Sequence, residues 1–161
     1  MKYFSLTAAV VLCLAGSARA QGWQEIVHEG FTLRWATTGA NELAVELTGP
    51  TTGWVAVGFD PDSMMLGANI IIGYVSGGTA FLRDDYGWQP TSHRDDTLLG
   101  GTSDVTIEGG SESGGQTQIA FTIPLDSGDP YDKPLFVGSG YTVLLARGPD
   151  GADNFTTQHE F

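Results

Sequence analysis

The feature that most constrains the fold is a series of short runs in which apolar and polar residues alternate, with glycine-rich turns between them. The run ELAVEL places Leu43, Val45 and Leu47 on one face, which is the period of a strand buried on one side. Glycine pairs such as Gly77-Gly78 follow the runs, where turns need positive φ. Because no segment keeps helical periodicity for three turns, the pattern predicts an all-β, antiparallel β-sandwich.

The sequence predicts about eight to ten strands. We expect them at residues 31–36, 42–47, 53–59, 69–75, 79–83, 104–108, 116–123 and 141–147. The runs GWVAVGF and NIIIGYV are continuously apolar, as strands buried on both faces are. The only helical structure expected is a short turn at 61–66. The polar segment 91–96, which carries His93, is expected to be a surface loop.

The first twenty residues predict export from the cytoplasm. Lys2 supplies a positive start, residues 8–15 (AAVVLCLA) form an apolar run, and ARA at 18–20 matches the small-x-small cleavage pattern. A membrane-spanning helix needs roughly 20 apolar residues, about twice this run. We therefore interpret 1–20 as a cleaved signal peptide and 21–161 as one domain that is secreted or periplasmic, without membrane insertion.

The composition of the mature chain narrows the classes of partner. Removal of Lys2 and Arg19 leaves five basic residues against 19 acidic ones, a net charge of −14 over 141 residues. This charge argues against nucleic acid and anionic membrane surfaces, because both require a basic footprint. It suits a cationic protein partner and equally serves solubility. Cys13 leaves with the signal peptide, so disulfides, thiolate metal sites and covalent C-x-x-C-H haem attachment are excluded.

Few residues remain that could carry chemistry. Nucleophile-elbow, Walker, H-E-x-x-H and complete calcium-loop motifs are all absent from the sequence. Segments 60–62 (DPD) and 150–154 (DGADN) resemble fragments of calcium loops, but turns favour Asp and Asn in any case. The remaining soft or imidazole ligands of the mature chain are His28, His93, His159, Met64 and Met65.

Several segments in order resemble the DOMON domain family. They are GWVAVGF at 53–59, MLGANIIIGYV at 65–75, DDY at 84–86, GGTSDV at 100–105, FTIPLDSGD at 121–129 and an aromatic-x-x-x-His pattern at 155–159. The resemblance covers nearly the whole mature chain and implies an immunoglobulin-like DOMON sandwich at 21–161. It further implies extracytoplasmic binding of haem or sugar, usually tied to redox chemistry.

The resemblance extends to the haem-binding branch of the family, which is similar to the cytochrome domain of cellobiose dehydrogenase. There one Met and one His hold a non-covalent b-type haem, and Met65 and His159 occupy those positions here. Asn69 stands where that branch commonly has Asp. Without the resemblance, a Met beside a turn is usually a core gap-filler and a His near the C-terminus is usually solvated. Met64 is expected to face away from Met65.

We therefore predict a soluble b-type cytochrome that carries single electrons outside the cytoplasm. With Met65 and His159 on both axial positions, no site would stay open for substrate, so no enzyme activity of its own is expected. The expected partner is a redox protein, such as a membrane cytochrome or an oxidoreductase. Two alternatives are a DOMON module without haem that binds a sugar or another small ligand, and an accessory domain of a membrane redox complex.

Overall fold

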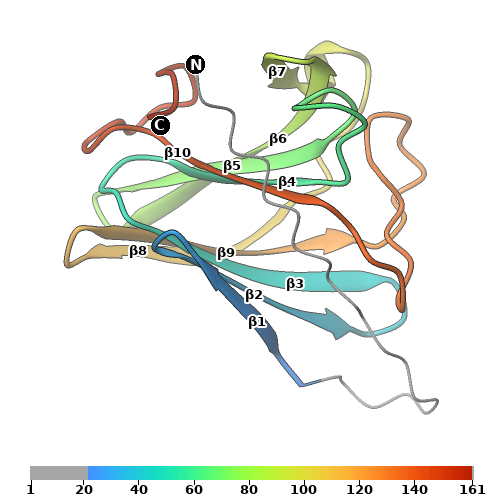
Figure 1. Cartoon of the computed structure of the whole chain (residues 1–161), viewed down its shortest axis with the longest axis horizontal. Coiled ribbons are helices and arrows are strands. Elements are labelled where there is room, and N and C mark those ends of the chain that lie inside the picture. Colours follow the sequence, from blue (N-terminus) through green and yellow to red (C-terminus); the bar gives the residue numbers. More distant parts are fainter. Residues whose placement is uncertain (1–21, 161) are drawn as a thin grey trace.

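Two five-stranded antiparallel sheets pack face to face in the computed structural model, which describes residues 22–160 (Figure 1). The proposed signal peptide lies outside the described residues. The first sheet has the strand order β1-β2-β3-β9-β8 and the second β10-β4-β5-β6-β7. The strands are β1 Gln24–His28, β2 Phe31–Thr38, β3 Glu42–Gly49, β4 Val55–Phe59, β5 Asn69–Ser76, β6 Thr79–Gln89, β7 Ser92–Asp95, β8 Thr106–Ser113, β9 Gln116–Pro124 and β10 Val143–Arg147.

The main core lies between the sheets and follows from the alternation along the strands. In β3, Leu43, Val45 and Leu47 are buried while the residues between them are only partly covered. Strands β4 and β5 are buried on both faces over most of their length, which explains why their sequences are continuously apolar. The inward side chains of both sheets form one cluster, whose fully buried members include Leu47, Ile71, Ile119 and Phe121.

The predicted β-sandwich is confirmed, and each predicted strand overlaps an observed one. Two local expectations were wrong. Residues 92–95, expected in a surface loop, form β7, which pairs with the end of β6. Residues 61–66 form turns rather than a helical turn, and the described helical structure is the 3₁₀ turn η1 at Asp96–Leu98. Among residues 22–160, no helix has the length and apolar character needed to cross a membrane.

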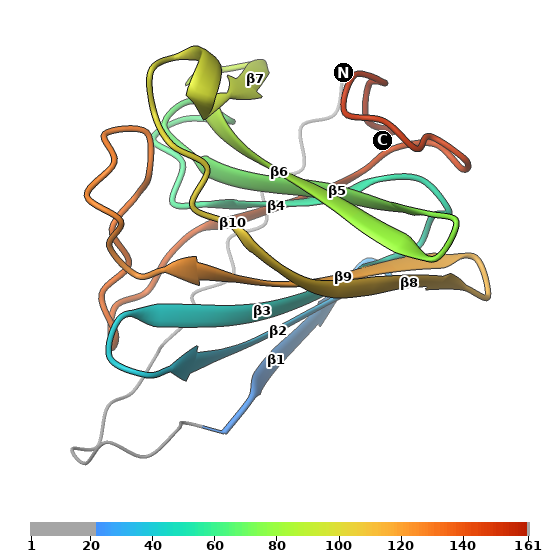
Figure 2. The ribbon, with the colours of Figure 1, turned by 180° about the vertical axis from the view of Figure 1, so that it is seen from behind.

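The segment that follows β10 lies over the second sheet. Figures 1 and 2 both place this segment and β7 on the side of the second sheet that faces away from the first sheet. The Trp54 indole N–H donates to the Thr157 carbonyl (3.1 Å), and the Glu160 amide donates to the Arg147 carbonyl (3.0 Å). These bonds hold the C-terminal segment near β4 and β10, so it can contribute to a site on that outer face.

Candidate functional site

The second sheet carries an apolar patch on its outer face. Because side chains alternate along a strand, Ile70 and Ile72 of β5 point to this face, whereas Ile71 joins the core between the sheets. We call the buried residues of this patch the outer cluster: Trp54, Ala56, Ala68, Ile70, Ile72 and Ala152. Partly buried side chains pack over it, namely Met65, Tyr74, Leu144, Ala146 and Phe155. The outer face is therefore a second, smaller apolar core that includes both Met65 and the C-terminal segment.

Met65 reaches the outer cluster from the turn that precedes β5. Its amide donates to the Pro90 carbonyl (3.2 Å), and its carbonyl accepts from the Ala68 amide (3.1 Å). Met64 has a φ of 56°, a left-handed conformation that costs a residue with a side chain about 1 kcal/mol. Met64 is 37% exposed, whereas Met65 packs on the outer cluster. The two residues lie in a turn rather than in the extended segment from which opposite faces were predicted.

Gly87 of β6 allows this turn to dock onto the sheet. Its amide donates to the Ala68 carbonyl (2.9 Å), and its carbonyl accepts from the Gly67 amide (2.7 Å). A Cβ at position 87 would lie 1.6 Å from the carbonyl oxygen of Met65. The position of the Met65 backbone therefore requires glycine at position 87, because any side chain there would overlap it.

His159 lies in the C-terminal segment, four residues after Phe155. Phe155 packs on the outer cluster, and its ring lies beside Tyr74, with ring centroids 5.0 Å apart. His159 is exposed over much of its surface. Its pKa is nevertheless lowered, first by partial desolvation of the ring and then by the charge of nearby His93. The histidine of the motif therefore lies on the same side of the second sheet as the outer cluster, with a second histidine near it.

His93 belongs to a charged network rather than to a solvated loop. It is half-buried in β7 and its Nδ1 bonds to the Asp85 carboxylate. Arg83 donates to the same carboxylate through two nitrogens, at 2.5 and 2.7 Å. The Arg83 guanidinium also lies over the Phe155 ring, 4.7 Å from its centroid. Although burial opposes its ionisation, the pKa of Asp85 is lowered, because His93 and Arg83 bond to its charged form.

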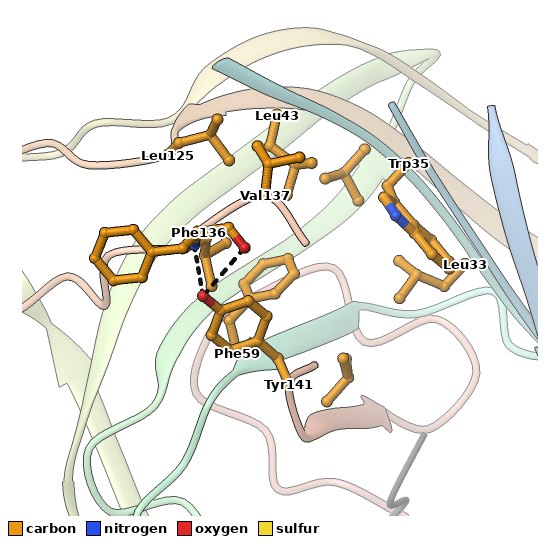
Figure 3. Close-up of a pocket in the computed structure, with 11 residues that line it drawn as sticks. Leu33, Trp35, Leu43, Phe59, Leu125, Phe136, Val137 and Tyr141 are labelled. Carbon is orange, nitrogen blue, oxygen red and sulfur yellow. Dashed lines mark hydrogen bonds between the residues drawn. The ribbon is translucent and has the colours of Figure 1, made fainter. Parts of the chain in front are cut away.

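A separate apolar cavity opens between the two sheets. Figure 3 shows its lining, in which Trp35, Phe59 and Tyr141 come from different strands or loops. Its volume is about 30 Å³, the space of roughly one water molecule, so a sugar would not fit without opening of the sandwich. The Trp35 indole nitrogen is buried there without a hydrogen-bond partner, while the Tyr141 hydroxyl bonds to the backbone of Phe136.

Three aspartates from distant segments converge at the loops beside β6. Asp84 of β6, Asp96 of η1 and Asp132 of the loop before β10 form this acidic triad, and one oxygen from each lies within 4.8 Å of the others. Burial raises the pKa of Asp84 to about 8 and that of Asp96 to about 7, and neighbouring carboxylates add to both shifts. Burial likewise raises the pKa of Asp132 to about 6. Sequence reasoning missed the triad, because no local spacing links its members.

Comparisons with known proteins agree with the architecture. The sequence model of the DOMON domain matches residues 27–148. DBH-like monooxygenase protein 2 of Mus musculus is 28% identical over 131 residues, which are 80% of this chain and 20% of that protein. DBH-like monooxygenase protein 1 of Homo sapiens is 30% identical over 105 residues, 65% of this chain and 16% of that protein. The chain thus spans about a fifth or less of the length of these relatives.

Proposed function

Because the chain belongs to the DOMON domain family, we propose that it is an extracytoplasmic haem-binding protein that carries single electrons. In this proposal Met65 and His159 would hold a non-covalent haem b through its iron. One observation carries the proposal: Met65 and the C-terminal segment that bears His159 both lie against the outer cluster.

The residues around this face fit such a group. Thioether and imidazole are an established ligand pair for haem iron. The outer cluster supplies apolar side chains for a macrocycle that no cysteine would anchor once Cys13 leaves with the proposed signal peptide. A bound haem would supply a one-electron couple. Gly87 and the Pro90 carbonyl would hold the Met65 backbone, and Phe155 would exclude water beside the site.

The expected partner is a redox protein with a basic docking surface, such as a membrane cytochrome or an oxidoreductase. The strongly acidic mature chain would steer toward a cationic surface, with a rate that falls as salt rises. A second candidate role, an accessory domain of a larger oxidoreductase, is favoured by the relatives named monooxygenases, of which this chain covers only a small part. A module that binds a sugar or another small ligand without haem is the remaining alternative, and the cavity between the sheets would have to open to admit a sugar.

The experiment that tests the haem proposal is spectroscopy of the secreted protein, purified and supplied with haem. We expect a low-spin spectrum in both oxidation states with one haem per chain. His159→Ala should lose the low-spin spectrum or the haem itself, whereas His28→Ala, on the exposed β1 of the other sheet, should change nothing. Met65→His should keep the haem and lower its potential, because a second imidazole favours ferric iron.

Two further variants locate the ligands. Met64→Leu is the matched control for Met65, because Met64 is exposed beside it, and this variant should retain the wild-type spectrum. His93→Ala tests whether the nearby histidine replaces His159 as the ligand. A folded wild-type protein with no Soret band would end the haem proposal, and the small-ligand module would then become the first candidate.

A further inference from the structure

We propose that the acidic triad of Asp84, Asp96 and Asp132 binds one Ca²⁺ ion. The site does not depend on the proposed haem, because Asp84 points to the inner side of β6 while the outer cluster lies on the other face. On β6, Asp84 pairs with Ile71 of the core between the sheets, and Asp85 pairs with Ile70 of the outer cluster.

The first argument is the unmet bonding capacity of the triad. Asp84 and Asp96 are each 1% exposed, yet Oδ1 of Asp84 and both carboxylate oxygens of Asp96 have no hydrogen-bond partner. Oδ1 of Asp132 is also buried without one. Buried polar atoms in folded proteins are nearly always bonded, and a buried charge is paired or binds a metal. One cation at the centre would satisfy all four oxygens.

The second argument is that the remaining oxygens are used to orient the carboxylates. The Asp104 amide donates to Oδ2 of Asp84 (2.9 Å), and the Ser127 hydroxyl donates to Oδ2 of Asp132 (2.6 Å). These bonds leave the Oδ1 atom of each aspartate for the shared centre. Partners that fix a ligand through its second atom are typical of metal sites.

The loops that carry the triad are held together without using its unpartnered oxygens. The Asp129 carboxylate accepts from the amides of Thr102 (2.6 Å) and Tyr131 (2.8 Å). The Tyr131 hydroxyl donates to the Leu99 carbonyl (2.8 Å). The segment after η1 and the segment before Asp132 are therefore tied to each other, so the aspartates come together before any ion binds.

The donor set favours calcium. Every triad ligand is oxygen, whereas Zn²⁺ usually takes nitrogen or sulfur ligands. Ca²⁺–O distances of about 2.3–2.6 Å allow two ligands of one ion to lie up to about 5 Å apart, which agrees with the 4.8 Å spread. Asn69, 5% exposed on the adjacent strand β5, adds a buried amide oxygen without a partner on the same inner face. Within residues 22–160, no basic side chain forms an ion pair with the triad.

The test is a calcium titration of the purified secreted protein after treatment with a chelator. Calorimetry should give one ion per chain. At 100 times the dissociation constant, the folding equilibrium constant should rise about 100-fold, equivalent to about 2.7 kcal/mol. In thermal unfolding this is a rise of roughly 5–10 °C in Tm. Mg²⁺ should give a smaller rise, because it loses its water ligands reluctantly.

The variants separate a cation site from a purely structural cluster. In chelator, Asp96→Asn should be at least as stable as wild type, because it removes a buried charge, but it should lose the calcium-induced rise in Tm. Asp153→Asn, an exposed control, should keep that rise. If Asp96→Asn does not fold, Asp132→Asn provides the same comparison at a half-buried position. Absence of binding by wild type at about 10 mM Ca²⁺, well above the weakest extracellular sites, or a full rise in the Asp96 variant, would overturn the proposal.

Discussion

Substitution of Gly87 by alanine tests how the Met65 turn is held. The added Cβ would lie 1.6 Å from the Met65 carbonyl oxygen and 2.6 Å from its carbonyl carbon. Both atoms are backbone, so no side-chain rotation can relieve the overlap. The turn must move away from β6 by about 1.5 Å to restore ordinary contact. Such a shift stretches the hydrogen bonds of Gly87 with the Gly67 amide and the Ala68 carbonyl.

The cost of Gly87→Ala follows from these contacts. Overpacking in a buried site costs about 1–3 kcal/mol, and weakening two backbone hydrogen bonds adds about 0.5–1 kcal/mol each. We therefore expect a loss of about 2–5 kcal/mol in the free energy of unfolding. For a domain of this size, that loss lowers Tm by roughly 5–15 °C. The proposed haem binding through Met65 should weaken in the same variant.

Thermal unfolding followed by circular dichroism measures this effect, and Gly58→Ala is the matched control. Gly58 lies in β4 of the same sheet, and a Cβ there would first meet Cγ1 of Ile70 at 3.2 Å. That atom belongs to a side chain that can adjust, so the control should lose no more than about 1 kcal/mol. If the Tm of Gly87→Ala lies within about 2 °C of wild type, the close contact at Met65 does not constrain the turn.

Three further predictions concern processing, pH and a buried hydroxyl. Secreted protein should begin at Gln21, and an intact signal segment in its mass spectrum would contradict this. In chelator, the free energy of unfolding should fall between pH 6.5 and 8, because the raised pKa of Asp84 keeps a proton in the folded state that the unfolded state has lost. One such proton gives a slope of about 1.4 kcal/mol per pH unit. A free energy that rises over this range in urea unfolding would refute the prediction. Thr51→Val should lower the free energy of unfolding by about 2–4 kcal/mol in the same assay. The buried Thr51 hydroxyl donates to the Gly148 carbonyl (2.8 Å) and accepts from the Gly53 amide (2.9 Å), and valine can do neither. A loss below about 1 kcal/mol would argue against these bonds.

The sandwich could be predicted because its strands carry their pattern locally. Strand β3 alternates so regularly that its buried face is visible in the sequence. Strand β7 could not be found in this way, because SHRD has no apolar face to bury. Its stability comes from pairing with the end of β6 and from the bond between His93 and Asp85. These contacts join residues that are separated along the chain, so the sequence of a short polar segment does not predict them.

The two candidate sites also differ in how far the local sequence could predict them. Met65 and His159 were proposed from motif positions, and haem ligation by them stays a prediction. Met65 and the C-terminal segment that bears His159 both lie beside one apolar face. The acidic triad had no such signal, because its members come from a strand, a 3₁₀ turn and a loop. The segment at 60–62 that resembles a calcium-loop fragment is not part of the triad. Its Asp62 forms an ion pair with Lys133 (Nζ to Oδ1, 2.8 Å).

Asp84 and Asp85 show why the sequence alone could not assign these roles. They are adjacent and identical in type, yet the pKa of Asp84 is raised to about 8 while that of Asp85 is lowered. Strand geometry turns consecutive side chains to opposite faces, so Asp84 meets other carboxylates while Asp85 meets Arg83 and His93. A cation bound at Asp84 would therefore fix the strand that also carries Asp85. The inner ion and the outer ligand face would then share β6 as their common support.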